Sequence, residues 1–347
     1  MRIALISDDL TRVSLELEEG VKVFNVTPYN YKMVLQFAKP DLLFVESAWN
    51  GFLNSWKYKI ASYPGYKNRS NKALKKVVNY AKSLGIPTLF WNKEDDVHHS
   101  RFKDSAVLCD YIFTVDVNSI PKYEAETGNP AYLLMFAVQP KIHSFSGFNF
   151  RYKKANFVGS YTRVMHTQRR QWQDMYFNTL CEMGFGVDVY NRNSNRTKKI
   201  YGYPKLECLR EYEKVSFTKT AQIYKDYMIS LNVNTITDSI TMFSRRLVEI
   251  IACGGVCITN PSLSVETLFK DYCFMVSSKE EFKEAVGKIL TDGLGKRELE
   301  KIKEGANYVL SRHTWTKRLE DIAHILGIES FDKISKTKAV NDYQKTF

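Results

Sequence analysis

The strongest constraint on the fold is an alternation of short apolar runs with longer amphipathic stretches. The apolar runs have the length of buried strands, and the amphipathic stretches have the three-to-four-residue repeat of helices. The clearest of these segments are residues 3–7, 42–45, 71–84, 88–91, 111–115 and 119–127. Strands that alternate with helices in this way predict βαβ units and a parallel sheet.

The same alternation restarts after a break in the middle of the chain. Residues 139–152 contain Pro140, Gly147 and several polar side chains but no periodic element, so we expect a domain boundary there. Beyond it, strands are predicted at residues 155–158, 187–190, 229–233, 256–259 and 273–276. Helices are predicted at residues 167–183, 245–252, 279–290, 297–311 and 314–326, the last of which could fold back across the first domain.

These elements predict an α/β protein with two Rossmann-like, doubly wound domains facing a central cleft. The predicted domains span residues 1–140 and 153–327, and residues 328–347 are expected to form a docked or flexible tail. In such folds, ligands bind beyond the carboxyl ends of the strands. Candidate site residues are therefore sought directly after the predicted strands.

Composition narrows the cellular setting. The amino terminus lacks a signal-peptide pattern, which predicts a cytoplasmic protein, and no run approaches the roughly 20 apolar residues of a membrane helix. Six scattered cysteines without a C-x-x-C pair favour free buried thiols over disulfides or structural zinc. The net charge of +12 indicates a polyanionic neighbour, which could be nucleic acid, an acidic membrane surface or a phosphate-bearing substrate.

The most informative segment runs from residue 231 to residue 260. A strand end leads through a hydroxyl-rich loop, with Ser239 and Thr241, into a helix that begins with Arg245 and Arg246. Free backbone N–H groups, the positive end of a helix dipole and two guanidinium groups together favour a diphosphate ligand. Glu249 shares the face of the arginines and could accept hydrogen bonds from ribose hydroxyls. A solvated ion-pair face is the competing interpretation.

This segment also carries a family resemblance. The stretch T-D-S-x-T-M-F-S-R-R-x-x-E-x-x-A-C-G-G at residues 237–255 resembles the carboxyl-terminal signature of glycosyl transferases group 1, in particular the spore-maturation-protein-like group. Residues 157–160 with Arg163, and residues 313–315 with Arg318, extend the resemblance over nearly the whole second half. Residues 46–51 and 90–95 resemble the amino-terminal domain of that group less specifically.

The resemblance implies a GT-B glycosyltransferase that moves a sugar from a nucleotide-diphosphate sugar to a hydroxyl acceptor. The acceptor would be a glycan, a lipid-linked molecule or a protein, in bacterial glycan or cell-envelope polymer synthesis. It implies no bound metal and no cofactor, because basic side chains and a helix amino terminus offset the charge of the leaving diphosphate. Thr241 stands where many group 1 transferases carry Glu, so their retaining mechanism is not assumed.

With this resemblance, the loop after residue 158 becomes part of the predicted donor site. Gly159 and Ser160 directly follow a strand, so their backbone can approach a phosphate, and Arg163 could neutralise it. His166, Arg169 and Arg170 continue this basic stretch into a helix and rank below Arg163. Asn191 ends the next strand, where a base or ribose is expected, although an ordinary polar loop explains it equally well.

The candidate catalytic groups lie in the first half, in the loop that follows the strand at 88–91. Inversion of configuration needs a base for the acceptor's proton, and Asp95 and Glu94 are the first candidates, with His98 as an alternative. A metal site in residues 95–99 has no supporting ligand spacing, so none is predicted.

A second loop of the first half supplies the predicted acceptor-binding residues. Ser47, Trp49 and Asn50 end another predicted strand and could line the acceptor pocket, with Trp49 offering an apolar plate for a sugar ring. Core packing explains Trp49 equally well.

Three other functions compete with the transferase interpretation. A nucleic-acid-binding protein would explain the charge, but no reading module is recognisable, so no nucleic-acid partner is expected. A dehydrogenase would need G-x-G-x-x-G after the first strand, and this sequence lacks it. A catalytically inactive protein that keeps the fold is compatible with Thr241. Charge and family together suggest peripheral contact with an anionic membrane, at its inner face.

Overall fold

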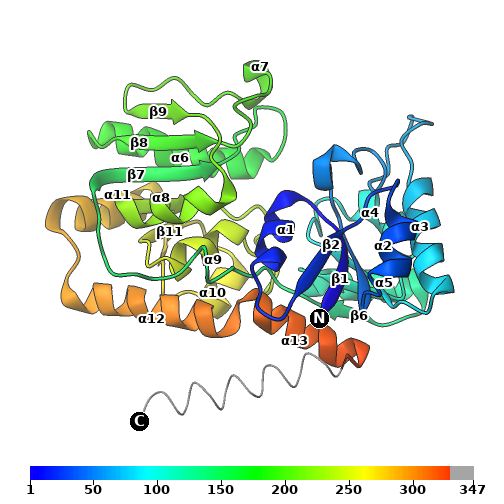
Figure 1. Ribbon diagram of the computed structural model, residues 1–347. Coiled ribbons are helices and arrows are strands. Elements are labelled where there is room, and N and C mark those ends of the chain that lie inside the picture. The colour runs from blue at the N-terminus through cyan, green and yellow to red at the C-terminus, as the bar shows by residue number, and fades with distance from the viewer. Residues whose placement is uncertain (329–347) are drawn as a thin grey trace, which may run out of the picture. The chain divides into compact units, whose positions relative to one another are not determined.

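The computed structural model describes residues 1–328 of the chain (Figure 1). It divides into two compact units, of which the first comprises Met1–Phe136 with the described residues from Trp315 onward, and the second comprises Ala137–Thr314. The sequence prediction kept residues 315–327 in the second domain, whereas their contacts place them in the first unit. The predicted tail lies outside the described residues, apart from Ile328.

The first unit is built on a six-stranded parallel sheet with the strand order β2-β1-β3-β4-β5-β6. Its strands are β1 (Arg2–Ile6), β2 (Lys22–Asn25), β3 (Leu42–Glu46), β4 (Thr88–Asn92), β5 (Tyr111–Thr114) and β6 (Ala131–Leu133). Every residue of β3 and β4 is buried, as expected for central parallel strands that are covered on both faces. The predicted parallel sheet is thus confirmed.

Helices enclose this sheet. They are α1 (Asp9–Glu16), α2 (Tyr31–Phe37), α3 (Lys72–Ser83), α4 (His99–Ala106), α5 (Ile120–Thr127) and α13 (Trp315–Leu326). Leu35, Val77 and Phe102 from three of the helices share one buried cluster with Val45 and Phe90 of the sheet. Helices α2, α3 and α4 therefore bury their apolar faces against one face of the sheet.

The last helix, α13, completes the first unit. The ring of Trp315 lies edge-on to that of Trp91, with centroids 5.4 Å apart. Nε of Arg318 donates to the carbonyl oxygen of Met135 at 2.8 Å. A buried aromatic pair and a guanidinium hydrogen bond explain why this helix packs with the first sheet although it follows the second in sequence.

The second unit repeats the architecture, with the strand order β12-β11-β10-β7-β8-β9 and all pairs parallel. Its strands are β7 (Tyr152–Gly159), β8 (Val187–Asn191), β9 (Leu209–Tyr212), β10 (Tyr227–Asn232), β11 (Cys257–Thr259) and β12 (Phe274–Met275). Its helices are α6 (Thr167–Glu182), α7 (Lys198–Tyr201), α8 (Thr220–Asp226), α9 (Arg245–Ala252), α10 (Leu263–Leu268), α11 (Lys279–Gly287) and α12 (Lys296–Arg312). The two doubly wound units confirm the predicted fold class.

One expectation about cysteines is wrong. Cys181 at the end of α6 and Cys208 just before β9 form a disulfide, with their Cα atoms 5.2 Å apart. The pairing of β8 with β9 brings the two thiols together across 27 residues, a proximity that cysteine spacing does not reveal. Cys109, Cys253, Cys257 and Cys273 are free, as expected. None of the helices in residues 1–328 is long and apolar enough to cross a membrane.

Candidate active site

The carboxyl edge of the first sheet gathers acidic side chains. Asp8 follows β1, and its carboxylate accepts hydrogen bonds at 3.0, 3.0 and 2.8 Å from the backbone N–H groups of Trp49, Asn50 and Gly51. Burial alone would raise the pKa of Asp8, but the charge of Lys93 and the backbone donors outweigh it and lower that pKa. Asp8 is therefore an ionised anchor for the loop after β3.

Glu46 and Lys93 complete this acidic cluster. Glu46 ends β3 and is fully buried, and its carboxylate accepts the backbone N–H of Asp8 at 2.7 Å and the hydroxyl of Thr11 at 2.5 Å. Nζ of Lys93 lies 3.0 Å from Glu46 and 3.4 Å from Asp8. One ammonium group thus balances two carboxylates, which leaves the cluster with a negative bias.

Glu94 follows Lys93 and has the surroundings that a general base requires. Its half-buried side chain is hydrogen-bonded to that of Trp49. Burial raises the pKa of Glu94, and although Lys93 and Trp49 oppose this, the charges of Glu46 and Asp8 add to it, so the net shift is upward. A carboxylate that binds a proton more readily than usual, and that solvent still reaches, is suited to take a proton from a hydroxyl.

Asp95 is adjacent in sequence but is held differently. It is fully buried, and its carboxylate accepts hydrogen bonds from Asn92 Nδ2 at 2.6 Å, the Thr114 hydroxyl at 2.8 Å and the Tyr123 hydroxyl at 3.0 Å. Nδ1 of His99 lies 3.1 Å away. Burial raises the pKa of Asp95. With its oxygens occupied by four neighbours, Asp95 positions the loop, and the geometry favours Glu94 over it as the base.

His98, Ser47 and Trp49 adjoin this loop. The ring of Trp49 contacts His98 edge-on, with centroids 5.2 Å apart, and Phe102 at 5.0 Å. The hydroxyl of Ser47 accepts the backbone N–H of Lys93 at 3.0 Å, which ties the loops after β3 and β4 together. Trp49 therefore packs on the helical layer, as core packing requires, and its use as a plate for a sugar ring stays a prediction.

The carboxyl edge of the second sheet is basic. β7 ends at Gly159, and the guanidinium group of Arg246, at the start of α9, lies beside it. A Cβ atom at residue 159 would be 2.7 Å from the ring of Phe157 and 3.2 Å from Nη2 of Arg246, so any other residue there would have to displace one of these side chains. The guanidinium carbon of Arg246 is 4.3 Å from the centre of the Phe157 ring, and the residue is 7% exposed.

A second arginine, Arg169 of α6, lies close to Arg246. Its Nη2 donates to the carbonyl oxygen of Ser160 at 2.9 Å. Burial lowers the pKa of Arg169 to about 10, and the charge of Arg246 contributes. Burial also lowers the pKa of Arg246, and the nearby charge of Arg192 adds to this effect. Guanidinium groups that repel one another in a buried place are typical of an anion-binding site.

Unsatisfied hydrogen-bond donors strengthen this interpretation. In the described part of the chain, the buried Nε of Arg169 and the buried Nε and Nη1 of Arg246 have no hydrogen-bond partner. Neither arginine forms an ion pair with a carboxylate of residues 1–328. Buried charges without a partner cost several kcal/mol, by order of magnitude. An anionic ligand would satisfy both the charges and the donors.

Helix α9 adds a dipole and a carboxylate to this edge. Its N-cap, Ser244, makes no side-chain hydrogen bond to the first turn, so the positive helix end carries no side-chain cap. Glu249, one turn later, is buried and accepts the hydroxyl of Tyr224 at 3.4 Å, and Nε of Arg245 lies 4.0 Å from it. The predicted grouping of Arg245, Arg246 and Glu249 is therefore a buried one and not a solvated ion-pair face.

The loop before α9 is shaped by buried amides and hydroxyls. Asn260 Oδ1 accepts the backbone N–H of Asn234 at 2.7 Å, and Asn234 Oδ1 accepts the backbone N–H of Ser244 at 2.9 Å. Ser239 Oγ accepts the backbone N–H of Thr241 at 3.3 Å, and the two hydroxyls lie 3.5 Å apart. Ser239 and Thr241 thus form a turn in this loop, and the two asparagines fix where α9 begins.

The remaining predicted donor residues lie at the margin of this group. Arg163 is exposed, and its Nη2 is 3.4 Å from the carbonyl oxygen of Tyr203. Asn191 is buried, and its Nδ2 donates to Glu211 at 2.7 Å. The geometry therefore favours Arg169, which the sequence ranked lower, over Arg163 as the phosphate-binding arginine of α6 and its preceding loop.

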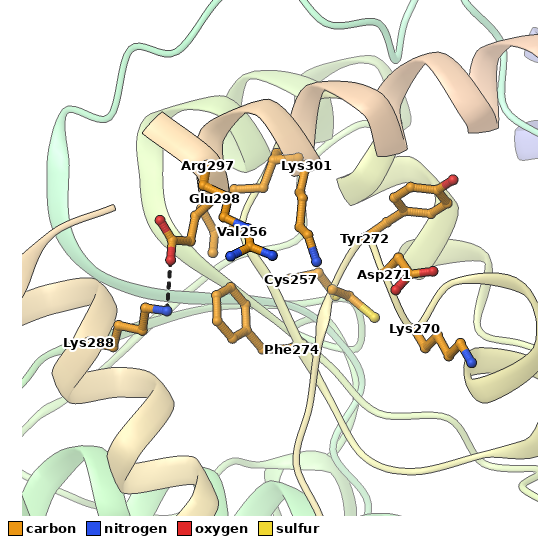
Figure 2. A pocket seen from close by; sticks show the side chains of 12 residues that line it. Val256, Cys257, Lys270, Asp271, Tyr272, Phe274, Lys288, Arg297, Glu298 and Lys301 are labelled. Carbon is orange, nitrogen blue, oxygen red and sulfur yellow. Dashed lines mark ion pairs between the residues drawn. The ribbon is translucent and has the colours of Figure 1, made fainter. Parts of the chain in front are cut away.

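A pocket of about 320 Å³ lies elsewhere in the second unit (Figure 2). It is lined by the amino ends of β11 and β12 and by the first turns of α12, and so lies at the opposite end of the strands from the arginines. The side chains of Arg297 and Lys301 point into it above the ring of Phe274. It contains none of the predicted site residues.

Sequence reasoning missed Asp8, Glu46, Lys93 and the importance of Arg169. The first two could have been found, because polar residues at the carboxyl ends of buried strands are the ones that this fold presents to ligands. Lys93 could have been found as the first cation after β4. Arg169 carries no such signal, since only the packing of α6 against β7 brings it to Ser160.

Comparison with known proteins supports the same two-unit architecture. Residues 163–324 match the sequence model of a family described as glycosyl transferase-like, which spans most of the second unit and reaches into α13. The second half of the chain is therefore similar to that family. The finer resemblance to a spore-maturation-protein-like group stays a prediction. No curated protein matches the chain at a significant level.

Solved structures extend the similarity to the first unit. T4 phage β-glucosyltransferase in complex with UDP and Mn²⁺ is 14% identical, with a TM-score of 0.59 over 94% of this chain and 99% of that one. A β-glucosyltransferase described as a DNA-modifying enzyme, with uridine diphosphoglucose as substrate, is 13% identical, with a TM-score of 0.59 over 94% and 100%. HepE of Anabaena in complex with UDP and glucose is 12% identical, with a TM-score of 0.57 over 94% and 91%. The chain has the fold of these GT-B glycosyltransferases.

No group of three or more His, Cys, Asp or Glu side chains in residues 1–328 is arranged to hold a metal ion. The T4 phage enzyme was solved with Mn²⁺. Metal independence of this chain therefore stays a prediction.

Proposed function

We propose that this chain is a glycosyltransferase that moves a sugar from a nucleotide-diphosphate sugar to a hydroxyl acceptor. The observation that carries the proposal is the pair Arg169 and Arg246, in which three buried donors, Nε of Arg169 and Nε and Nη1 of Arg246, lack a hydrogen-bond partner within the described residues. Arg246 lies beside Gly159, where the absence of a side chain lets its guanidinium group pack close to the end of β7.

The second unit binds the donor. The diphosphate accepts hydrogen bonds from Arg169 and Arg246 and lies near the amino end of α9, where the helix dipole favours negative charge. Glu249 accepts hydrogen bonds from the ribose hydroxyls. During transfer, the bond between the anomeric carbon and the phosphate oxygen breaks, and its electron pair leaves with the diphosphate. The arginines stabilise that growing charge.

The first unit supplies the base. The acceptor hydroxyl forms the new bond to the anomeric carbon, and its proton passes to the carboxylate of Glu94. Ser47, Trp49 and Asn50 belong to the neighbouring loop that Asp8 anchors, so they provide the acceptor subsite. Since one carboxylate takes the proton as the bond forms, we propose that configuration inverts. Thr241, where a group 1 retaining enzyme has Glu, is compatible with that outcome.

The donor base is proposed to be uracil, because similar structures contain UDP or UDP-glucose by their descriptions. The resemblance of residues 237–255 suggests a role in bacterial glycan or cell-envelope polymer synthesis. The two arginines provide the positive charge that a metal would otherwise supply to the leaving diphosphate, which supports a metal-independent mechanism.

A thermal-shift panel of UDP, GDP, CDP, dTDP and ADP tests the proposal. A ligand that binds only the folded protein raises the melting temperature, and we expect UDP to give the largest increase. Arg246→Ala should abolish that increase. Arg210→Ala, which removes an exposed arginine over Tyr212 in the same unit, should leave it unchanged. Absence of a shift with all five nucleotides at millimolar concentration would refute a nucleotide-sugar site.

The alternative is a GT-B protein that binds the donor but does not transfer it. Thr241 favours this alternative, because it provides no carboxylate close to the donor. Slow hydrolysis of UDP-glucose, with water in place of the acceptor, separates the two functions. UDP release that depends on Glu94 supports the enzyme, whereas UDP binding without release supports the inactive protein.

A further inference from the structure

Helix α2 presents an apolar stripe to solvent. Tyr29, Met33 and Phe37 follow one another at intervals of four residues and therefore share one face of the helix and its preceding turn. These side chains are 85%, 61% and 74% exposed. Single exposed apolar residues are ordinary, but three large ones aligned on one helix face mark a contact surface.

The loop after β3 adjoins this stripe. Nζ of Lys59 lies over the ring of Tyr29, 5.6 Å from its centre, and the indole N–H of Trp56 donates to the carbonyl oxygen of Val26 at 2.7 Å. Trp56 is fully buried, so the loop is anchored against the end of β2. The same loop exposes Leu53 to 79%. The loop and the start of α2 are thus held together, and the apolar side chains of both are exposed to solvent.

The surroundings of the stripe are strongly basic. Residues 47–93 contain nine Lys and Arg residues and no Asp or Glu. Six of the lysines are exposed on the loop and on α3. Lys82 pairs with Asp110, and the other five are Lys57, Lys67, Lys72, Lys75 and Lys76. α3 lies beside α2, since the rings of Tyr31 and Tyr80 meet edge-on at 5.6 Å. Exposed apolar side chains surrounded by uncompensated cations suit a partner that is both anionic and apolar.

We propose that this surface, defined by Tyr29, Met33, Phe37, Leu53, Lys57 and Lys67 and here called the α2 surface, docks on an anionic lipid membrane. The lysines attract the anionic headgroups, and the apolar side chains enter the boundary between headgroups and acyl chains. The charge complementarity comes from residues 47–93, in which no acidic side chain would repel the lipid. The inference rests on the proposed function, because it specifies how a lipid-linked acceptor would reach the enzyme.

Two tyrosines next to the α2 surface, Tyr58 and Tyr66, each have a ring face that is not free for a nucleic-acid base. Single strands bind by stacking bases on free aromatic faces. The guanidinium carbon of Arg69 instead lies 4.1 Å from the ring centre of Tyr58 and 4.2 Å from that of Tyr66. Those faces are already covered. Met33 and Leu53, which are among the exposed apolar side chains, cannot stack with bases but insert readily into lipid.

The α2 surface is connected in sequence to the acidic cluster of the first unit. The loop that exposes Leu53 continues directly from Asn50 and Gly51, whose backbone N–H groups are bound by Asp8 at the acidic cluster. An acceptor anchored in the membrane under the α2 surface would thus have its hydroxyl close to the loop that holds Glu94. The proposed acceptor class is accordingly a lipid-linked hydroxyl compound at an anionic membrane.

Co-sedimentation with vesicles tests the proposal on the full chain. The wild type should bind vesicles of phosphatidylcholine with about one third phosphatidylglycerol, and should bind vesicles of phosphatidylcholine alone at least tenfold more weakly. The variant Tyr29→Ser/Met33→Ser/Phe37→Ser keeps all charges and should lose at least tenfold in affinity for the anionic vesicles. Lys57→Ala/Lys67→Ala should lose about fivefold for each lysine removed.

The matched control removes two cations from another place. Arg297→Ala/Lys301→Ala lowers the net charge equally but changes only the pocket of the second unit in Figure 2. It should bind the anionic vesicles like the wild type. An equal loss in this control, unchanged binding by the triple variant, or wild-type binding that does not depend on phosphatidylglycerol would overturn the proposal.

Two further measurements separate this proposal from others. A single-stranded oligonucleotide that binds the wild type and the triple variant equally, and displaces the vesicles, would assign the surface to nucleic acid and overturn the lipid proposal. The thermal shift with UDP should persist in every variant of the α2 surface. Vesicle binding without a UDP shift would refute the donor site alone, and a UDP shift without vesicle binding would refute the α2 surface alone.

Discussion

The carboxyl edges of the two sheets have the same architecture and opposite charge. In the first unit, Asp8 and Glu46 share one lysine, and Glu94 lies in the same loop with a raised pKa. In the second unit, Arg169 and Arg246 repel one another, and burial lowers the pKa of both. A doubly wound sheet thus provides only the position of a site, and the side chains at the strand ends decide whether it takes a proton or an anion.

Both edges keep charges that the fold alone does not need. A buried guanidinium without a partner and a carboxylate with a raised pKa each destabilise the folded state, so their presence indicates chemistry with a ligand. The same comparison predicts that substitutions at the two edges impair different steps. Changes on the acidic edge should impair the proton transfer, whereas changes on the basic edge should impair donor binding.

The largest effect is expected from Glu94→Gln. The amide keeps the shape of the side chain but cannot take a proton, so hydrolysis of UDP-glucose should fall by roughly 10³-fold. Steady-state measurement of UDP release gives the rate. The rate of the wild type should also fall as the pH drops through the raised pKa of Glu94, because only the ionised carboxylate accepts a proton. The rate of the variant should not show this fall at low pH.

UDP binding by Glu94→Gln provides the internal control. Its thermal shift with UDP should equal that of the wild type, because Glu94 belongs to the first unit and the arginines to the second. A variant that hydrolyses UDP-glucose at the wild-type rate would remove Glu94 from the mechanism and return Asp95 and His98 to consideration.

The second effect in size is expected from Arg246→Met. Loss of charged hydrogen bonds to the diphosphate should weaken UDP binding by about 100-fold, or roughly 3 kcal/mol, measured by calorimetry. The unliganded variant should be at least as stable as the wild type, because methionine fills a similar space on the Phe157 ring and removes a buried charge without a partner. A large drop in the melting temperature without ligand would contradict an anion-binding role and indicate a structural one.

A third, smaller effect concerns the acidic edge and acid stability. The pKa of Asp8 is lower in the folded state, so its stabilising contribution is complete above the ordinary value of about 4 and disappears as the pH falls through the lowered value. Asp8→Asn should cost about 1–3 kcal/mol at neutral pH. It should also flatten the loss of stability in acid, measured by urea unfolding at several pH values. If Asp8→Asn lost stability in acid as the wild type does, other carboxylates would be responsible for that loss.

The sequence predicted the central elements of both sheets well and the edges poorly. β3 and β4 are buried at every residue, which gives uninterrupted apolar runs that are readily recognised. The edge strands β2 and β9 are mostly half-buried or exposed, and their mixed composition hides them. Helix α2 was not predicted for a different reason. Its apolar side chains point to solvent as well as to the core, so the sequence shows no clear helical period.

The candidate site was predictable where strand ends determine it. Gly159, Arg246 and Glu249 were predicted from strand ends and helix spacing together with the family resemblance. The choice between Glu94 and Asp95 does not, because the residues are adjacent in sequence and differ only in what surrounds them. The hydrogen bonds of Asp95 come from β5 and α5, and no local pattern reveals them.

The smallest effect is expected at the point where the backbone approaches the basic edge most closely. A Cβ atom at Gly159 would be 2.7 Å from the Phe157 ring and 3.2 Å from Nη2 of Arg246, so Gly159→Ala must displace one of them. A guanidinium shifted by a few tenths of an ångström keeps its charge but loses hydrogen-bond geometry, so UDP affinity should fall by about fivefold. Calorimetry beside Gly186→Ala, where the nearest atom would be 3.6 Å away, controls for the general cost of a methyl group in this unit. Equal UDP affinity in both variants would mean that the diphosphate does not lie against the end of β7, and the comparison between the two edges would lose its donor side.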